Sequence, residues 1–307
     1  MKIEYVLRQG WSLGRLPGLN DFMKNLLFSL LTVTTLTVSA QPYSLRKGRE
    51  AALLGAGVVT YGAAFALNTT LDPLTQAQVD QLNRNNVPRF DRSALTKFSV
   101  GADRLSDATL AGGISLTGVV ILTSKTPENR GAAFTRSDLY TVGVMYVETM
   151  LLTNALKDAT KNLVERTRPF AYNPVAPLEE KLERDTQRSF YSGHASNAFA
   201  TAVFAAEVFR HYHPHSRAKP LIWIGSLGLA SATTYLRYEA GKHFPSDLLV
   251  GAAMGSLAGW GIPKLHENRP APAGSFWKNA TLAPWSNGLA SGVYLRWNVS
   301  SVSFVKK

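Results

Sequence analysis

The sequence contains no cysteine among its 307 residues. This absence excludes disulfide bonds, thiolate catalysis and cysteine-ligated zinc, and it is compatible with an oxidising compartment without requiring one. Charged residues are also scarce, at 18% of the chain, but their balance gives a formal net charge of +12. An excess of positive charge favours anionic partners such as phosphate esters or anionic lipid surfaces. No nucleic-acid-binding motif occurs, so we expect no nucleic-acid partner.

Long apolar runs without a charge are rare as well. Ala51–Leu71 alone reaches the length of about 20 residues that a membrane-spanning helix needs. Glu148 and Glu207 interrupt two other apolar stretches, and a carboxylate in the middle of a membrane is costly. The mean hydropathy is near zero, which is ordinary for a soluble protein. These features favour a soluble or peripherally attached protein, with an integral membrane protein as the alternative.

The N-terminal 40 residues have the composition of a leader with a secretory signal. Met23-Lys24-Asn25 precedes an apolar segment over residues 26–38, and Ser39-Ala40-Gln41 has the small residues of a cleavage site. Met23 is a candidate for the true start, and an uncleaved anchor helix is the competing interpretation. The signal predicts export, with the protein acting in the periplasm.

The rest of the chain divides into a helical domain over residues 41–265 and a C-terminal tail over residues 266–307. About six core helices are expected from apolar stretches at Ala51–Leu71, Ala108–Ser124, Leu139–Leu156, Ala195–Phe209, Leu221–Leu236 and Leu248–Ile262. After Pro263 the pattern changes, and Ser291–Ser300 alternates weakly, as a strand does. We therefore predict an all-α bundle followed by an irregular or weakly β tail.

Three short segments between residues 161 and 247 carry the chemistry. They are Lys161-Asn-Leu-Val-Glu-Arg-Thr-Arg168-Pro169, Tyr191-Ser192-Gly193-His194 and Arg237-Tyr-Glu-Ala-Gly-Lys-His243-Phe-Pro-Ser-Asp247. Arginine and lysine bind phosphate oxygens as a planar fork and a compact charge. A serine that caps a helix leaves backbone N–H groups for an anion. A carboxylate four residues after a histidine is placed to fix its tautomer. This inventory suits holding a tetrahedral oxyanion, attacking it and protonating its leaving group.

The three segments resemble the motifs of the type 2 phosphatidic acid phosphatase/vanadium haloperoxidase superfamily, in order and in spacing. The chain departs from that pattern at Tyr191, where proline is usual, and at Leu236, where serine is usual. The resemblance implies an all-α bundle with its site at one end. It also implies a phosphatase for phosphate monoesters or lipid (di)phosphates that needs no metal or other cofactor.

The resemblance further implies a role for each motif residue. His243 would be the nucleophile that forms a phosphohistidine, Asp247 would orient it, and His194 would protonate the leaving group. The phosphate oxygens would be held by Lys161, Arg168, Ser192, Gly193 and Arg237. Tyr191 and Lys242 are hypotheses for substrate contact. Arg166 and Lys157 occupy no motif position and are interpreted as ordinary surface cations of a helix.

Two other functions stay open at this point. The same residues suit a vanadate-dependent haloperoxidase, with His243 as the vanadate ligand, and a non-catalytic anion-binding membrane protein that kept the fold is the second alternative. His211, His213 and His215 form a histidine-rich segment, but their neighbours Pro214 and Arg217 are typical of an exposed turn rather than a metal site. The preferred ester and the oligomeric state are not fixed by the sequence.

Overall fold

The computed structural model describes residues 41–68, 72–123, 135–268, 280–286 and 291–297. The chain forms two compact units, one over Gln41–Asn268 and one formed by residues 1–40 and 269–307. In the second unit, β1 (Ala280–Ser286) and β2 (Ser291–Trp297) pair as an antiparallel hairpin. The strand predicted after residue 291 is thus present as far as residue 297. The predicted leader lies outside the described residues.

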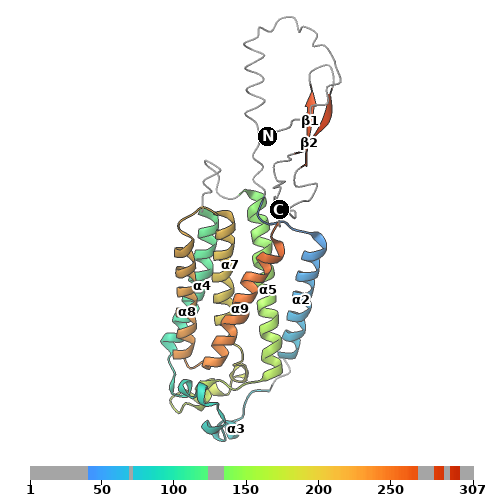
Figure 1. The fold of residues 1–307 in the computed structure, drawn as a ribbon. Helices are drawn as coiled ribbons and strands as arrows, with labels where there is room; N and C mark the ends of the chain where they lie inside the picture. Colours follow the sequence, from blue (N-terminus) through green and yellow to red (C-terminus); the bar gives the residue numbers. More distant parts are fainter. Residues whose placement is uncertain (1–40, 69–71, 124–134, 269–279, 287–290, 298–307) are drawn as a thin grey trace, which may run out of the picture. The chain divides into compact units, whose positions relative to one another are not determined.

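The first unit is a bundle of long helices, as the sequence predicted. They are α2 (Lys47–Asn68), α4 (Val100–Thr123), α5 (Arg136–Val164), α7 (Gly193–Tyr212), α8 (Lys219–Glu239) and α9 (Pro245–His266). Short elements join them: α3 (Gln76–Asp80), α6 (Leu178–Lys181), and the 3-10 helices η1 (Arg84–Asn86), η2 (Arg89–Thr96), η3 (Pro169–Tyr172) and η4 (Arg184–Gln187). These short elements gather at one end of the bundle, at the bottom of Figure 1. The connections that carry the three motifs lie at that end.

The helices α7 and α9 touch through their backbones. A Cβ atom added at Gly255 would lie 2.1 Å from the carbonyl oxygen of Ser196, and one at Gly259 would lie 2.4 Å from that of Ala200. Only glycine permits so close an approach. This contact fixes the start of α7, which carries the second motif, against the start of α9, which carries the end of the third.

Each helix end at the motifs has an identifiable local cause. α5 stops at Val164 because Glu165 adopts a left-handed conformation with φ 45°, four residues before Pro169. Ser192 caps α7, as predicted, with its hydroxyl accepting from the backbone N–H of Ala195 at 3.3 Å. Pro245 opens α9, and the Asp247 carboxylate in the first turn accepts from the N–H of Phe244 at 2.9 Å. The sequence therefore sets where the motif side chains emerge.

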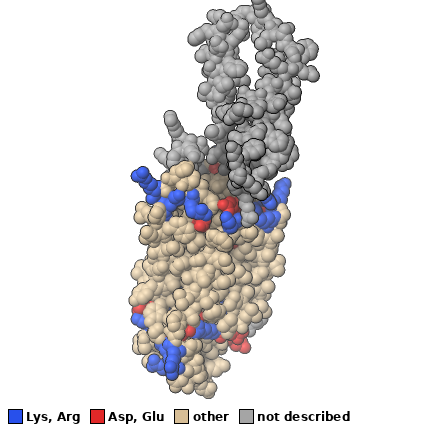
Figure 2. All heavy atoms as spheres, in the orientation of Figure 1, with Lys and Arg blue, Asp and Glu red and all other residues tan. Residues whose placement is uncertain are grey.

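The side wall of the bundle is apolar. Figure 2 shows Lys, Arg, Asp and Glu gathered at the two ends of this unit, with an uncharged band between them on the face in view. By length and composition, α2, α4 and α9 could each cross a membrane. Large apolar side chains are exposed on these helices, among them Val59, Leu122 and Trp260. An apolar surface of this kind is not expected of a soluble monomer.

The expectation of a soluble bundle therefore does not fit, and membrane association is favoured. The sequence argument failed because Glu148 and Glu207 do not face outward. Glu148 is 0% exposed and Glu207 is 8% exposed, so both carboxylates point into the protein rather than toward lipid. The helix predicted at Ala108–Ser124 is also longer than its apolar run, since α4 already begins at Val100.

Candidate functional site

The three motifs meet at the end of the bundle where α5, α7 and α8 border the connecting segments. Lys161 lies in the last turn of α5, His194 in the first turn of α7, and Arg237 in the last turn of α8. His243 follows α8 in the short link to α9. Side chains that are far apart in the sequence thus share one buried region, and His243 lies within it at 1% exposure.

The imidazole of His243 is fixed by a backbone carbonyl. Its Nδ1 atom lies 2.8 Å from the carbonyl oxygen of Ser189. A carbonyl oxygen only accepts, so Nδ1 carries the proton and the lone pair of the neutral ring is on Nε2. This tautomer leaves Nε2 free to act as a nucleophile.

Three cations surround this ring closely enough to affect its titration. Burial lowers the pKa of His243 well below 6.5, and the positive charges of Arg168, Lys161 and Arg237 lower it further. A lowered pKa keeps the imidazole neutral at neutral pH. The same charges that would hold a phosphate therefore also keep the proposed nucleophile unprotonated.

Lys161 and Arg168 are each held by hydrogen bonds to the segment over residues 185–188. The Nζ atom of Lys161 donates to the carbonyl oxygen of Arg188 at 2.6 Å. Arg168 donates to the carbonyl oxygen of Asp185 at 2.9 Å and pairs with its carboxylate. Burial would raise the pKa of Asp185, but Arg168 and Lys161 outweigh it, so the pKa is lowered and the carboxylate stays charged.

Arg237 is held by the helix opposite it. Its guanidinium pairs with Asp103 and donates to the hydroxyl of Ser106 at 3.1 Å, both on α4. Its Nε atom is buried and has no hydrogen-bond partner among the described residues. A buried donor without a partner is costly, so this N–H is available for an oxygen of a bound anion.

His194 contacts a carboxylate that the sequence analysis did not select. Its Nε2 atom lies 2.6 Å from Asp107 on α4. Burial and the charge of Arg237 lower the pKa of His194 to about 4, although Asp107 opposes them. Asp103 and Asp107 stand four residues apart, which places them on one face of a helix. That spacing was the signal in the sequence by which this pair could have been found.

Ser192 and Gly193 of the second motif form the N-terminal end of α7, where backbone N–H groups begin the helix. Ser192 is fully buried and its hydroxyl is occupied by the helix cap, while its N–H donates to the carbonyl oxygen of Asp247 at 3.1 Å. Lys157 lies over Gly193, where a Cβ atom would come within 2.9 Å of its side chain. Lys157 is therefore not an ordinary surface cation, because it borders the second motif and donates to Asn154 at 3.0 Å.

Asp247 differs from the expectation in its contacts. Its Oδ2 atom is 3.8 Å from Nδ1 of His243, which is beyond hydrogen-bond distance. The carboxylate instead accepts from the Ser189 hydroxyl and the Phe244 N–H, and pairs with Arg166. Asp247 thus holds the segment that presents the Ser189 carbonyl to the imidazole.

Arg166 was wrongly interpreted as a surface cation. It links Asp247 to Asp91, whose carboxylate lies 2.8 Å away, and its guanidinium stacks 4.1 Å from the ring of Phe244. Asp91 in turn accepts from the N–H and hydroxyl of Ser246. Residue spacing gave no indication of this network, because Asp91 is 75 residues from Arg166 in the sequence.

The two substrate-contact hypotheses find different surroundings. Tyr191 is 2% exposed, and its hydroxyl has no hydrogen-bond partner among the described residues. Lys242 is held by Glu180 at 3.3 Å and by Asp103 at 3.5 Å. Lys242 therefore belongs to the cluster of charges around Arg237, whereas Tyr191 is part of the interior.

The histidine-rich segment at the end of α7 does not form a site. His211 contacts Tyr43 at 2.8 Å, and His213 is buried against Phe209 with ring centroids 4.5 Å apart. His215 is exposed. Within the described ranges, the grouping of three or more His or acidic side chains that could hold a metal ion lies elsewhere and includes none of these three.

Part of the chain is similar to proteins of known family. Residues 142–271 match the PAP2 superfamily. A lipid A 4'-phosphatase of Bacteroides thetaiotaomicron is 33% identical over 127 residues, which cover 39% of this chain and 53% of that protein. A lipid A 4'-phosphatase of Porphyromonas gingivalis is 23% identical over 175 residues, which cover 56% of this chain and 69% of that protein. The chain therefore spans about half the length of the first relative.

One solved structure is also among the similar proteins. It is the transmembrane PAP2 type phosphatidylglycerolphosphate phosphatase from Bacillus subtilis, with a TM-score of 0.42 and 19% identity over 70% of this chain and 94% of that one. All three motifs lie within residues 142–271, the region of the chain that matches the PAP2 superfamily.

Proposed function

We propose that this protein hydrolyses the phosphate ester of a phosphorylated lipid through a phosphohistidine at Nε2 of His243. One observation carries the proposal: a buried, neutral imidazole with a free Nε2 lies among Arg168, Lys161 and Arg237. A nucleophile inside a ring of fixed cations suits phosphoryl transfer, in which positioning and charge stabilisation supply most of the catalysis. The phosphoric ester hydrolase activity of family relatives supports the same conclusion.

In the first step, Nε2 of His243 attacks phosphorus and the bond to the ester oxygen breaks. His194 donates its proton to the leaving alkoxide. The non-bridging oxygens are held by Arg168, Lys161 and the Nε–H of Arg237, together with Ser192, Gly193 and the N-terminus of α7. A bound phosphate adds negative charge beside His194, which opposes the burial and the Arg237 charge that lower its pKa. The contact with Asp107 stabilises the protonated ring.

In the second step, water attacks the phosphohistidine. Neutral His194 takes a proton from this water, the P–N bond breaks, and the electron pair returns to Nε2 of His243. Inorganic phosphate leaves, and both histidines return to their initial states. The side chains of this chain supply every proton and charge in these steps, so we propose that no metal takes part in the reaction.

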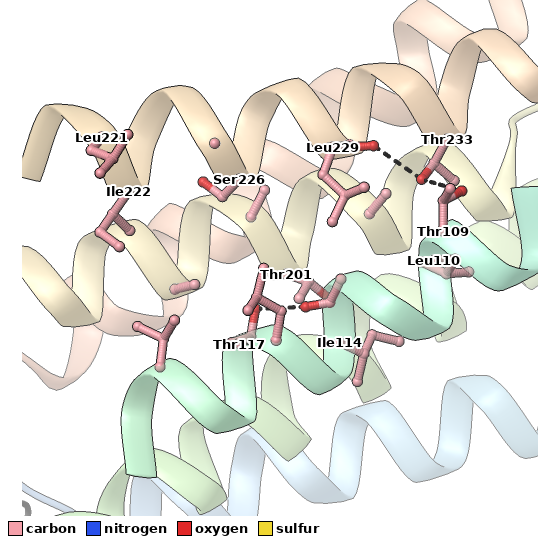
Figure 3. Close-up of a pocket in the computed structure, with 18 residues that line it drawn as sticks. Thr109, Leu110, Ile114, Thr117, Thr201, Leu221, Ile222, Ser226, Leu229 and Thr233 are labelled. Atoms are coloured by element: carbon pink, nitrogen blue, oxygen red, sulfur yellow. Dashed lines mark hydrogen bonds between the residues drawn. The ribbon is translucent and has the colours of Figure 1, made fainter. Parts of the chain in front are cut away.

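An apolar cavity supports a lipid rather than a soluble substrate. The cavity, of about 120 Å³, lies between α4, α7 and α8 and is lined by residues such as Leu110, Ile114 and Leu229 (Figure 3). It reaches Thr233, whose hydroxyl donates to that of Thr109 at 2.9 Å. Thr233 is one turn from Arg237 on α8. The cavity thus extends among apolar residues toward the proposed phosphate site. This is the arrangement expected of a pocket that holds the acyl chain of a lipid phosphate.

The test is phosphate release by the protein purified in detergent, with His243→Ala beside the wild type. Lipid A, phosphatidate and p-nitrophenyl phosphate are the substrates, and lipid A comes first because the two relatives are lipid A 4'-phosphatases. We expect chelator-resistant release that His243→Ala abolishes, with lipids preferred over p-nitrophenyl phosphate. Labelled substrate should leave an acid-labile, base-stable phosphoprotein in the wild type. Equal turnover by His243→Ala would refute the mechanism.

We also propose that this end of the bundle faces the periplasm. The basic turn over residues 210–219 lies at the opposite end of the bundle, and it supports this placement because cytoplasmic loops of membrane proteins carry an excess of Lys and Arg. Lipid phosphates of the outer leaflet would then reach the site without crossing the membrane.

A further inference from the structure

A second cluster of titratable side chains lies among α2, α5 and α9, away from the motifs. It consists of Glu50 in the first turn of α2, Glu148 within α5, and His266, the last residue of α9. One ligand atom from each residue lies within 4.8 Å of the others. The three helices lie side by side (Figure 1). None of these residues takes part in the proposed reaction.

The cluster is closed off from solvent and short of donors. Glu148 and His266 are both 0% exposed, and Glu50 is 8% exposed. Neither carboxylate oxygen of Glu148 has a hydrogen-bond partner among the described residues, and the same is true of Oε2 of Glu50. A buried carboxylate without a donor or a cation is strongly unfavourable. The site therefore calls for a positive charge between these groups.

The imidazole of His266 is oriented as a ligand. Its Nδ1 atom lies 2.8 Å from the carbonyl oxygen of Ile262, so Nδ1 carries the proton. Its Nε2 atom then faces Oε1 of Glu50 at 3.0 Å and Oε2 of Glu148 at 3.1 Å. Nε2 also has no hydrogen-bond partner of normal geometry among the described residues. A lone pair that points at two carboxylates requires either a second proton on the ring or a metal ion.

Arg49 balances only one of the two carboxylates. It donates to Oε1 of Glu50 from two nitrogens, at 2.7 and 2.9 Å, and leaves Oε2 of that residue free. No corresponding partner neutralises Glu148 among the described residues. Nε2 of His266 therefore lies close to one Glu50 oxygen that Arg49 already holds and to one Glu148 oxygen that has no donor, while the second oxygen of each carboxylate also lacks a partner among the described residues.

We propose that Glu50, Glu148 and His266 bind a divalent transition-metal ion, of the class of Zn²⁺ or Mn²⁺, that joins α2, α5 and α9. One nitrogen and two carboxylate oxygens suit these ions better than calcium. Zinc ligands lie about 2.0–2.2 Å from the metal, which puts tetrahedral ligands about 3.3 Å apart, close to the separations at Nε2. A ring nitrogen that donates to a backbone carbonyl while the other binds metal is the usual arrangement of ligand histidines.

The ion would act on stability rather than on the phosphate chemistry. It would tie the first turn of α2 and the last turn of α9 to the middle of α5. Metal binding to a site that exists only in the folded protein stabilises that state. The core beside it, which includes Tyr43, Met145 and Ile262, would be held by the same cross-link.

The experiment uses the full-length protein in detergent, stripped with a chelator and then titrated with Zn²⁺ or Mn²⁺. Metal content after gel filtration should be about one ion per chain, and thermal unfolding followed by tryptophan fluorescence should shift to higher temperature with metal. Glu148→Gln keeps the shape of the side chain and removes its charge. We expect this variant to lose at least about tenfold in metal affinity and to lose the thermal shift, as metal sites do when a supporting group is changed.

Three further measurements keep the result unambiguous. His215→Gln removes an exposed histidine and should leave both readouts unchanged, which excludes binding to the histidine-rich segment. His266→Gln should behave as Glu148→Gln does, and Co²⁺ in the wild type should give d–d absorption bands that are absent from Glu148→Gln. Sub-stoichiometric metal, or an equal thermal shift in Glu148→Gln, would overturn the proposal. A Glu148→Gln protein that is more stable than a metal-insensitive wild type would show that a proton occupies the cluster instead.

Discussion

Arg166 pairs with Asp247 across the start of α9, although Asp247 is 0% exposed and Arg166 stands outside the residues that define the motifs. The same guanidinium holds Asp91, which is 2% exposed. One arginine therefore pairs with two buried carboxylates. Through Asp247 and Ser189 it supports the carbonyl that orients His243.

Replacing Arg166 with alanine should destabilise the protein strongly. Removing one partner of a buried ion pair costs about 3–5 kcal/mol, because the remaining charge is left unpaired. We expect a large fall in the midpoint of thermal unfolding and a loss of phosphatase activity, with Arg166→Lys in between because it keeps the charge and loses the fork. Arg184→Ala, at an exposed position, is the matched control and should change stability by no more than about 0.5 kcal/mol. Equal unfolding midpoints for the two alanine variants would contradict the network.

In the pH profile of kcat/KM, the loss of activity on the acid side should occur at a pH well below 6.5. Protonation of His243 removes the nucleophile, and its pKa in the folded protein lies below 6.5 through burial and the charges of Arg168, Lys161 and Arg237. Activity should therefore persist as the pH falls through 6.5 and be lost at lower pH. Lys161→Met removes one of these charges, so the acid limb should move up toward 6.5, whereas Lys161→Arg should leave it in place. Residual activity in a stopped assay is sufficient to locate the limb, and an unmoved limb in Lys161→Met would argue against this electrostatic control.

Asp247→Asn separates direct from indirect support of the nucleophile. In a serine protease triad, where the carboxylate bonds the imidazole, the same change costs about 10⁴-fold in kcat. Here the Ser189 carbonyl fixes the tautomer and the carboxylate is 3.8 Å from Nδ1. We expect a fall of about 10- to 100-fold, comparable to the loss of an outer-shell contact. Steady-state kinetics and phosphoprotein trapping would measure it, and a 10⁴-fold loss in a stably folded variant would restore the direct role.

The backbone contact between α7 and α9 predicts a sharp difference between two glycines of one helix. Gly255→Ala places a Cβ atom 2.1 Å from the Ser196 carbonyl oxygen, whereas Gly261 has nothing within 4 Å of that position. Overpacking costs about 1–3 kcal/mol or more, while alanine gains up to about 1 kcal/mol over glycine within an open helix. Gly255→Ala should thus unfold at lower temperature and lose activity, and Gly261→Ala should be neutral or stabilised. Similar unfolding curves for the two variants would contradict the close approach.

The absence of cysteine makes the orientation in the membrane directly measurable. Glu179→Cys places a thiol at an exposed position at the site end of the bundle, and Arg217→Cys places one in the exposed turn between α7 and α8. If the site faces the periplasm, a membrane-impermeant maleimide should label Glu179→Cys in intact cells and Arg217→Cys only after lysis. The opposite pattern would place the site in the cytoplasm. Labelling of both residues in intact cells would exclude a spanning bundle.

The parts of the site that the sequence predicted are those set by local rules. The Ser192 cap follows from the preference of serine for the residue before a helix, and it places the second motif at the start of α7. The spacing of the motifs predicted a shared site, and Lys161, Arg237 and His243 do lie at the same end of the bundle. The number of long helices and the all-α class were predictable from the apolar stretches of helical length.

The missed parts depend on which way a side chain faces. Glu148 was taken as evidence against a membrane, and its inward orientation reverses that argument. Arg166 lacked a recognisable spacing because its partner Asp91 comes from another segment of the chain, and the position of Lys157 beside Gly193 depends on how α5 packs against α7. The role expected of Asp247 differed because a backbone carbonyl, which no sequence pattern displays, occupies the position next to Nδ1 of His243.

The division of labour among the helices has a consequence for how such proteins diversify. His194 lies on α7 and His243 directly precedes α9, and these two helices are in backbone contact, whereas the cavity is lined largely by α4 and α8. Substitutions can therefore change the shape of the cavity while the positions of the two histidines relative to each other are kept. A lineage can acquire a new lipid by altering the cavity-lining residues of α4 and α8, provided that it keeps Asp103, Asp107 and Arg237 at the site ends of those helices and the glycines that join α7 and α9.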